Sequence, residues 1–412
     1  MTSATRRRPG SFGLAGLLLG AALAGTLGAC VGGPDGGARV ERRAAPVQQA
    51  EAPAPDAPLA AAGSRIGTGS VKVALVVPLT GPGSAVGTAM RNAAELAIED
   101  FQKPDLQIVV KDDRGSPDGA REAAQAALAD GAELVLGPLF AANVQAASTV
   151  VRAAGKPLIA FSTDSGVAAR GTYLLSFLPQ AEVDRVVDEA VAGGRKSFAA
   201  MIPETSYGNA VEAQFREAVA RKGARLVAIE RYPAGNPAPA IGRLSGLITG
   251  PGAQADALFL PDTPDGLGTV AAALTKAGFS PARVRPIGTA IWNDPRVFAQ
   301  PALQGGWYAA PDVAGFNGFA QRYQARFGAA PPRVATLAYD AVSLMAALSR
   351  QYGSQRFADT TLTNPSGFFG IDGTFRFRPD GPSDRALAIF EIRSGAPAVV
   401  SPAPRTLGPS GT

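Results

Sequence analysis

The residue types that most often carry enzyme chemistry are scarce in this chain. Its 412 residues include no histidine and one cysteine, Cys30. Serine–histidine and cysteine–histidine nucleophilic systems are therefore excluded, as are metal sites that need imidazole or paired thiolates. The sequence contains no nucleophile-elbow motif, and spacing alone locates no pair of carboxylates for glycoside hydrolysis. We therefore predict a protein that is not an enzyme and that uses no cofactor.

A glycine-containing turn is the first place where binding chemistry is expected. Residues 71–77 form a nearly continuous apolar run, which is typical of a strand covered on both faces in a parallel sheet. In residues 86–101 the apolar side chains recur with a helical period instead. Thr80 lies in the turn between the two segments, and the free N–H groups of the following helix favour negative charge. This strand-turn-helix predicts part of a small-ligand site.

Nucleotides and nucleic acids are poor partners for this sequence. The spacing of Gly81, Gly83 and Gly87 is one residue longer than the dinucleotide-binding fingerprint, which disfavours a nicotinamide or flavin cofactor. The net charge of +5 is diffuse, and the part expected to fold contains no Lys/Arg block with interleaved aromatic residues. We therefore expect no binding of nucleic acid.

Strands and helices are predicted to alternate along most of the chain. After the opening unit, the first series has strands at 106–111, 133–136, 157–161 and 173–177 and helices at 117–130, 143–154 and 181–192. The second series has strands at 198–202, 226–232, 257–260 and 284–287 and helices at 209–222, 241–248 and 267–277. Helices at 316–327 and 334–352 follow, and then two strands at 374–378 and 387–392 that read as a β-ribbon. The pattern predicts an α/β fold of two doubly wound, Rossmann-like lobes.

The first thirty residues resemble the signal of a bacterial lipoprotein. Three arginines at 6–8 precede an uncharged apolar stretch at 12–27, which ends in Leu27-Gly28-Ala29-Cys30. We predict a signal peptide at 1–29, lipidation of Cys30, and a flexible tether at 30–70 that is rich in Gly, Ala and Pro. Val31 stands where an aspartate would retain the protein at the inner membrane, so the resemblance implies the periplasmic leaflet of the outer membrane.

Several short motifs follow one another between residues 71 and 395. They are Pro78-Leu79-Thr80-Gly81-Pro82, Asp112-Asp113, Gly137-Pro138, Tyr207-Gly208, Tyr339-Asp340-Ala341 and Gly370-Ile371-Asp372-Gly373. In this order they resemble the type I periplasmic binding proteins of the leucine/isoleucine/valine-binding family. The resemblance implies two α/β lobes joined by a hinge, with a small polar ligand held between them.

The resemblance also implies boundaries for the lobes. The first lobe would comprise residues 71–192 and 312–352, and the second lobe residues 193–311 and 353–394. Residues 395–412 contain several prolines and are predicted to be a disordered tail.

Candidate ligand-binding residues follow from these motifs. Backbone N–H groups at Ala141 and Ala142 and the hydroxyls of Ser162 and Thr163 offer a place for a carboxylate. An ammonium group would need Asp164, Asp262, Asp265 or Asp294. The remaining candidates are Thr80, Tyr207, Thr263 and Trp292, although Tyr207 and Trp292 also suit packing roles, whereas Asp340 and Arg333 read as exposed charges.

Two functions remain open at this stage. The first is a solute-binding lipoprotein that binds an amino acid or a related amide and presents it to an ABC permease or a sensor. Because Phe140 to Asn143 are mainly apolar where relatives offer a hydroxyl, we do not expect a standard leucine site. The alternative is a lipoprotein similar to the penicillin-binding protein activators, which contact a peptidoglycan synthase.

Overall fold

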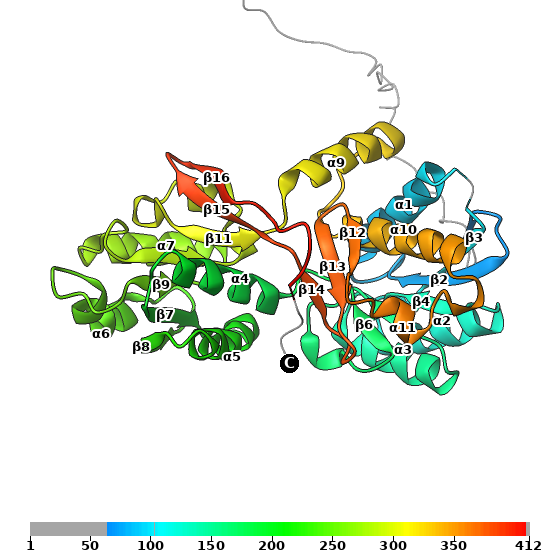
Figure 1. The fold of residues 1–412 in the computed structure, drawn as a ribbon, viewed down its shortest axis with the longest axis horizontal. Coiled ribbons are helices and arrows are strands. Elements are labelled where there is room, and N and C mark those ends of the chain that lie inside the picture. The colour runs from blue at the N-terminus through cyan, green and yellow to red at the C-terminus, as the bar shows by residue number, and fades with distance from the viewer. Residues whose placement is uncertain (1–63, 103, 409–412) are drawn as a thin grey trace, which may run out of the picture. The chain divides into compact units, whose positions relative to one another are not determined.

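The computed structural model describes residues 64–102 and 104–408 (Figure 1). Within these residues the chain forms a six-stranded sheet, a seven-stranded sheet and a small three-stranded sheet. Parallel strands alternate with helices in both large sheets, which confirms the predicted α/β fold with two doubly wound lobes. We call the lobe built on the six-stranded sheet the first lobe and the other the second lobe.

The six-stranded sheet has the order β1-β3-β2-β4-β5-β6. Its strands are β1 (Arg65–Ile66), β2 (Val71–Val77), β3 (Leu106–Asp112), β4 (Leu134–Leu136), β5 (Leu158–Ala160) and β6 (Thr172–Leu174). The short β1 pairs antiparallel with β3, and the other neighbours pair in parallel. Residues 65–66 were expected to belong to the tether, so the tether prediction is wrong for the last residues before β2.

Alternate residues of β2 pack into different hydrophobic cores on the two faces of this sheet. Val73 and Leu75 pack with helices α1 (Ser84–Asp100), α9 (Val313–Phe327) and α10 (Ala335–Gln351). Ala74 and Val76 pack with α2 (Pro117–Ala129) and α3 (Ala141–Ala153). The near-continuous apolar run of β2 is therefore explained by burial on both faces.

The seven-stranded sheet has the order β16-β15-β11-β10-β9-β7-β8. Its strands are β7 (Ser197–Pro203), β8 (Arg225–Tyr232), β9 (Ala257–Phe259), β10 (Arg285–Gly288), β11 (Trp307–Ala310), β15 (Ala388–Arg393) and β16 (Ala396–Ser401). One face packs against α4 (Pro179–Ala192) and α5 (Ser206–Arg221). The other face packs against α6 (Ala238–Ile248), α7 (Pro264–Lys276) and α8 (Pro295–Phe298).

The predicted lobe boundaries need two corrections. Helix α4 was assigned to the first lobe, but Val183, Val186 and Val187 pack into the core of the second sheet beside Phe198. Residues 353–394 were assigned to the second lobe, but most of them belong to the first. Helix α11 (Asp359–Leu362) and the three-stranded sheet of β12 (Phe368–Gly370), β13 (Gly373–Phe377) and β14 (Ser383–Arg385) pack on the first lobe through Leu362, Phe375 and Phe377.

The end of the chain also differs from the expectation. The two segments predicted to form a ribbon are strands, but β13 pairs with β12 and β14, whereas β15 pairs with β11 and β16. The disordered tail from Gly395 is wrong over β16, which pairs antiparallel with β15. Ser401 in β16 also accepts a hydrogen bond at 2.6 Å from Arg185 in α4. The prolines suggested disorder, but they are compatible with this strand. Pro397 lies on the edge strand β16 and Pro402 directly follows it, where a missing N–H is tolerated.

The predicted signal peptide, Cys30 and the tether as far as residue 63 lie outside the described residues. In the two stretches from 64 to 102 and from 104 to 408, no helix is both long enough and apolar enough to cross a membrane.

The pairing of β16 predicts that the chain end stabilises the second lobe. A chain truncated after Ser394 loses β16 and leaves β15 as an unpaired edge, so we expect its free energy of unfolding to fall by at least about 2 kcal/mol and its tendency to aggregate to rise. Chemical denaturation and light scattering measure the two effects. A chain truncated after Gly408 is the control and should behave like the full chain. Equal stability of both truncated chains would contradict the structural role of β16.

Candidate functional site

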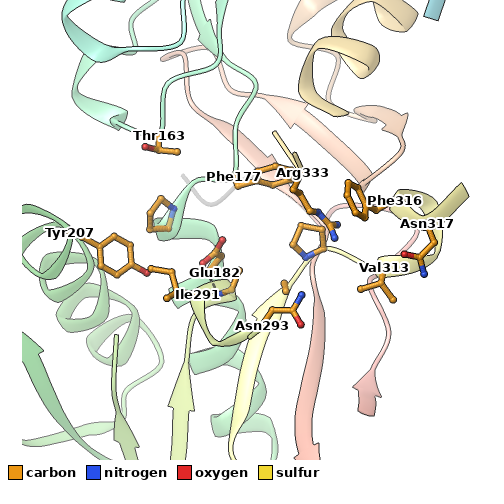
Figure 2. Close-up of a pocket in the computed structure, with 14 residues that line it drawn as sticks. Thr163, Phe177, Glu182, Tyr207, Ile291, Asn293, Val313, Phe316, Asn317 and Arg333 are labelled. Atoms are coloured by element: carbon orange, nitrogen blue, oxygen red, sulfur yellow. Dashed lines mark hydrogen bonds between the residues drawn. The ribbon is translucent and has the colours of Figure 1, made fainter. Parts of the chain in front are cut away.

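A cavity of about 750 Å³ is lined by residues from both lobes (Figure 2). The lining residues are Thr163, Phe177, Pro179, Glu182, Tyr207, Ala290, Ile291, Asn293, Ala310, Pro311, Val313, Phe316, Asn317 and Arg333. Aliphatic, proline and aromatic side chains predominate. The lining also contains one carboxylic acid, Glu182, and one guanidinium group, Arg333. The composition is that of a binding pocket for a small molecule with an apolar body.

Most lining residues lie just beyond the carboxyl end of a parallel strand or at the start of a helix. Thr163 follows β5, Ala290 to Asn293 follow β10, and Tyr207 lies in the first turn of α5. In an open α/β sheet this edge collects the loops that bind ligands. The fold therefore explains why residues far apart in the sequence surround one cavity.

Helix α5 is started by a side-chain cap that fixes Tyr207. The Thr205 hydroxyl accepts a hydrogen bond at 3.0 Å from the Gly208 N–H, as expected of an N-cap residue. The Tyr207 hydroxyl is 2.7 Å from the Thr289 hydroxyl, which follows β10. This hydrogen bond holds the Tyr207 ring beside Ile291 at the second-lobe side of the cavity.

Glu182 is a buried carboxyl group in the first turn of α4. Glu182 is 6% exposed, and one of its carboxyl oxygens accepts a hydrogen bond at 2.9 Å from the Ala290 N–H. Burial raises the pKa of Glu182 to about 8, and the hydrogen bond from Ala290 opposes that rise only in part. At neutral pH most molecules therefore carry Glu182 as a neutral acid, which can donate a hydrogen bond.

Arg333 brings the positive charge to the cavity. Its guanidinium pairs with Asp372, a residue with no exposed surface, and donates a further hydrogen bond at 3.1 Å to the Asp312 carbonyl. The group lies 4.8 Å from the ring centroid of Phe316 and 5.9 Å from that of Phe177, so both rings contact the cation with their faces. Figure 2 shows Arg333 between these two rings.

The structure brings two of the ten predicted ligand-binding residues, Thr163 and Tyr207, to this cavity. The other first-lobe candidates make local contacts instead. The Thr80 hydroxyl donates to Asp112 at 2.6 Å, and the Ser162 hydroxyl accepts from the Asp164 N–H at 3.1 Å. Asp164 in turn accepts from the Gly166 N–H at 2.8 Å, whereas Ala141 and Ala142 begin α3 and do not line the cavity.

The second-lobe candidates are also held within their own lobe. Asp262 is 8% exposed and accepts hydrogen bonds at 2.7 Å from the Tyr232 hydroxyl and from the Thr263 N–H. Thr263 caps α7 through the Gly266 N–H at 3.3 Å.

Trp292, a candidate for ligand binding that also suited a packing role, has the packing role in the structure. It has no exposed surface, and its indole N–H donates to the Leu260 carbonyl at 2.9 Å. A Cβ atom on Gly288 would lie 2.1 Å from the indole, so the absence of a side chain there makes room for the ring.

The charged alternatives for an ammonium are not free either. Asp265 and Asp294 both pair with Arg296, at 2.7 and 2.9 Å. The interpretation of Asp340 as an exposed charge is wrong, because Asp340 is 3% exposed and accepts a hydrogen bond from the Ile371 N–H. Arg333, interpreted in the same way, lines the cavity with its side chain 27% exposed.

Sequence patterns missed the residues that give the cavity its chemistry. Glu182 lies three residues after Pro179, which occupies the first position of α4, and this proline-led helix start was the one signal available for it. No signal marked Phe177, Phe316 or Arg333, because their place in the cavity depends on contacts between segments far apart in the chain.

The comparisons with known proteins agree with this architecture. A family model described as periplasmic binding protein matches residues 70–397. A search of curated protein sequences finds no match.

Three solved structures illustrate the shared fold. A putative branched-chain amino acid ABC transporter from Rhodospirillum rubrum is 22% identical with a TM-score of 0.71, covering 80% of this chain and 99% of that chain. A branched-chain amino acid ABC transporter periplasmic ligand-binding protein from Burkholderia xenovorans LB400 is 18% identical with a TM-score of 0.65, covering 82% and 96%. A solute-binding protein of an ABC transporter from Rhodopseudomonas palustris BisB5 is 22% identical with a TM-score of 0.56, covering 81% and 96%.

These likenesses confirm the resemblance seen in the order of the sequence motifs. The matched region begins one residue before β2 and ends in β16, so it includes every strand of the two large sheets except β1 and most of β16, and every residue that lines the cavity. The chain belongs to the periplasmic binding protein family.

Proposed function

We propose that this protein binds a small solute in the cavity between its lobes, outside the cytoplasm, and presents it to a membrane transporter. The observation that carries the proposal is the cavity itself, to which both lobes contribute side chains. A volume of about 750 Å³ lies in the range of sites for metabolite-sized ligands, roughly 300–1,000 Å³. The first lobe contributes Phe316 and Arg333, and the second contributes Glu182, Tyr207 and Ile291.

A solute in this position would contact both lobes at once. Binding would then favour arrangements in which the lobes enclose it, because those arrangements make the larger number of contacts and exclude more water. Because the solute favours the enclosing arrangement of the lobes, a transporter can recognise the loaded protein by that arrangement. No bond is made or broken in the solute.

The apolar lining selects for solutes with an apolar body. The rings of Phe177, Phe316 and Tyr207 and the side chain of Ile291 supply most of the apolar surface. Two solved structures with the same fold contain small bound carboxylic acids, 3,4-dihydroxybenzoic acid in the Rhodopseudomonas palustris protein and isoleucine in one from Streptococcus pneumoniae. Both ligands have a carboxylate, and isoleucine has an ammonium group as well.

The membrane anchor belongs to the proposal as well. A lipid on Cys30 and a tether as far as residue 63 would span roughly 30 Å and would hold the lobes near the membrane surface. Attachment to the periplasmic leaflet of the outer membrane and transfer to an ABC permease remain predictions. Contact with a peptidoglycan synthase, the alternative partner, is a prediction too. No contact between residues in the described ranges favours that partner over a solute.

Filling the cavity tests solute binding directly. We expect Ile291→Trp to abolish the thermal stabilisation that a bound solute gives, because the indole would occupy the space between Tyr207 and the first lobe. A panel of amino acids, small carboxylates and small amides serves as the probe, and a ligand at about one hundred times its dissociation constant adds about 2.7 kcal/mol. Val399→Trp, on β16 and 48% exposed in the wild type, is the matched control. A stabilising solute whose effect survives Ile291→Trp would place binding elsewhere.

Glu182 predicts how stability depends on pH. Because burial raises the folded-state pKa of this carboxyl to about 8, its protonated form favours folding at low pH, and this contribution is lost as the pH rises from about 4.5 towards 8. Between about pH 5 and about pH 8 we expect the wild-type free energy of unfolding to fall by roughly 3 kcal/mol relative to Glu182→Gln. Urea denaturation at a series of pH values measures this difference.

Glu217→Gln provides the control for this titration, because Glu217 lies on α5 with its side chain 68% exposed. Its stability should follow the wild type at every pH. A Glu182→Gln protein with the same pH dependence as the wild type would show that Glu182 is ionised at neutral pH.

A further inference from the structure

Arg333 connects the cavity to a cluster of buried charged residues. Asp372, in the turn between β12 and β13, pairs with the Arg333 guanidinium through one carboxylate oxygen. Its other oxygen accepts a hydrogen bond at 2.5 Å from the Thr336 hydroxyl in the first turn of α10. Both oxygens of this carboxylate therefore have partners within the protein.

A second arginine lies in the same cluster. Arg385, at the end of β14, is 7% exposed, and one of its N–H groups donates to the Asp372 carbonyl at 3.4 Å. Its guanidinium lies 5.1 Å from the centroid of the Phe177 ring, which also faces Arg333. The Nε atoms of Arg333 and Arg385, and Nη2 of Arg385, have no hydrogen-bond partner among the residues that the structure describes.

The cluster has more positive than negative charge. The Arg333 guanidinium pairs with the Asp372 carboxylate, and the Arg385 guanidinium donates to the carbonyl of the same residue. Asp340 is a further acid in this region, and burial raises its pKa to about 7. Burial therefore disfavours the ionised form of Asp340. The carboxylate of Asp312 caps α9 through the Ala314 N–H and does not line the cavity. Positive charge is thus left over next to an apolar cavity, where water screens it poorly.

The opposite side of the cavity offers no compensating negative charge. Glu182 is the acid that lines it, and its raised pKa leaves it mainly neutral at pH 7. Asn293 and Asn317, the remaining polar residues apart from Thr163 and Tyr207, are uncharged. A ligand that brought an ammonium group would have to ionise Glu182 in a buried position, whereas a ligand that brought only a carboxylate would neutralise Arg333.

We infer that the solute of this cavity is a small organic monoanion, a carboxylate with an apolar or aromatic body and no ammonium group, bound by Arg333. This inference rests on the proposed function and narrows its ligand class. It replaces the predicted amino acid with the corresponding simple acid. Asp372 and Thr336 act as positioning residues, because they hold Arg333 between Phe177 and Phe316 without contacting the solute.

Matched pairs of ligands test the inference on the unmodified protein. 4-Methylpentanoate and leucine differ only in the α-ammonium group, as do 3-phenylpropanoate and phenylalanine. Isothermal titration calorimetry at pH 7 should give at least about tenfold tighter binding for one of the simple acids than for its amino acid. The uncharged amide 4-methylpentanamide completes the series and reports the contribution of the apolar body alone.

Substitution of Arg333 tests where the carboxylate binds. Hydrogen bonds to charged groups contribute about 1.5–3 kcal/mol, so Arg333→Gln should weaken binding of the simple acid about 10- to 100-fold. Binding of the amide should change less than about threefold, because it gains little from the cation. Arg333→Lys keeps the charge next to Asp372 and should lose less affinity than Arg333→Gln. Arg326→Gln, on the exposed side of α9, is the matched control and should bind like the wild type.

The outcomes separate the inference from the proposed function. Tighter binding of a simple acid, lost in Arg333→Gln, supports both. Leucine or phenylalanine binding as tightly as its simple acid, or acids that keep their affinity in Arg333→Gln, would overturn the inference and leave solute binding intact. Failure of every acid, amino acid and amide to bind would overturn the inference and count against the proposed function.

Discussion

The ion pair between Arg333 and Asp372 is the interaction on which the site depends most. Asp372 has no exposed surface, so its charge has lost almost all contact with water and requires protein partners. Arg333 and Thr336 supply them, and removing one member of such a buried pair typically costs about 3–5 kcal/mol because the other is left uncompensated. The pair ties the start of α10 to the turn between β12 and β13 and fixes a cation at the cavity.

The parallel sheets determine where the cavity beside Arg333 lies. Each lobe places its ligand-side loops at the carboxyl edge of its strands, and the second lobe brings Tyr207 and Ile291 to the cavity that Arg333 enters from the first. The rings of Phe177 and Phe316 lie beside the guanidinium, and this apolar surface strengthens its attraction for an anion. Glu182 contributes a neutral acid on the other side, so the site combines one charge with hydrogen-bonding groups.

The sequence predicted the order of strands and helices well, because burial of β2 on both faces and the helical period of α1 are local signals. It failed where packing partners are distant. The sequence of helix α4 would suit either lobe, and only its packing with Phe198 shows that it belongs to the second lobe. Tyr207 was predicted from a motif at a helix start, whereas Arg333 depends on a carboxylate 39 residues away and Glu182 on an N–H 108 residues away. The sequence left Trp292 open between ligand binding and packing, because a sequence does not reveal which way an indole points.

A solute bound in the cavity would contact both lobes at a single site. Hydrogen exchange measured by mass spectrometry, with and without saturating 4-methylpentanoate, tests it most directly because it reports on every segment at once. We expect backbone amides near Ala290 and Ile291 in the second lobe and near Phe316 and Thr336 in the first to become protected together. Protection confined to one lobe, or none at either, would contradict it.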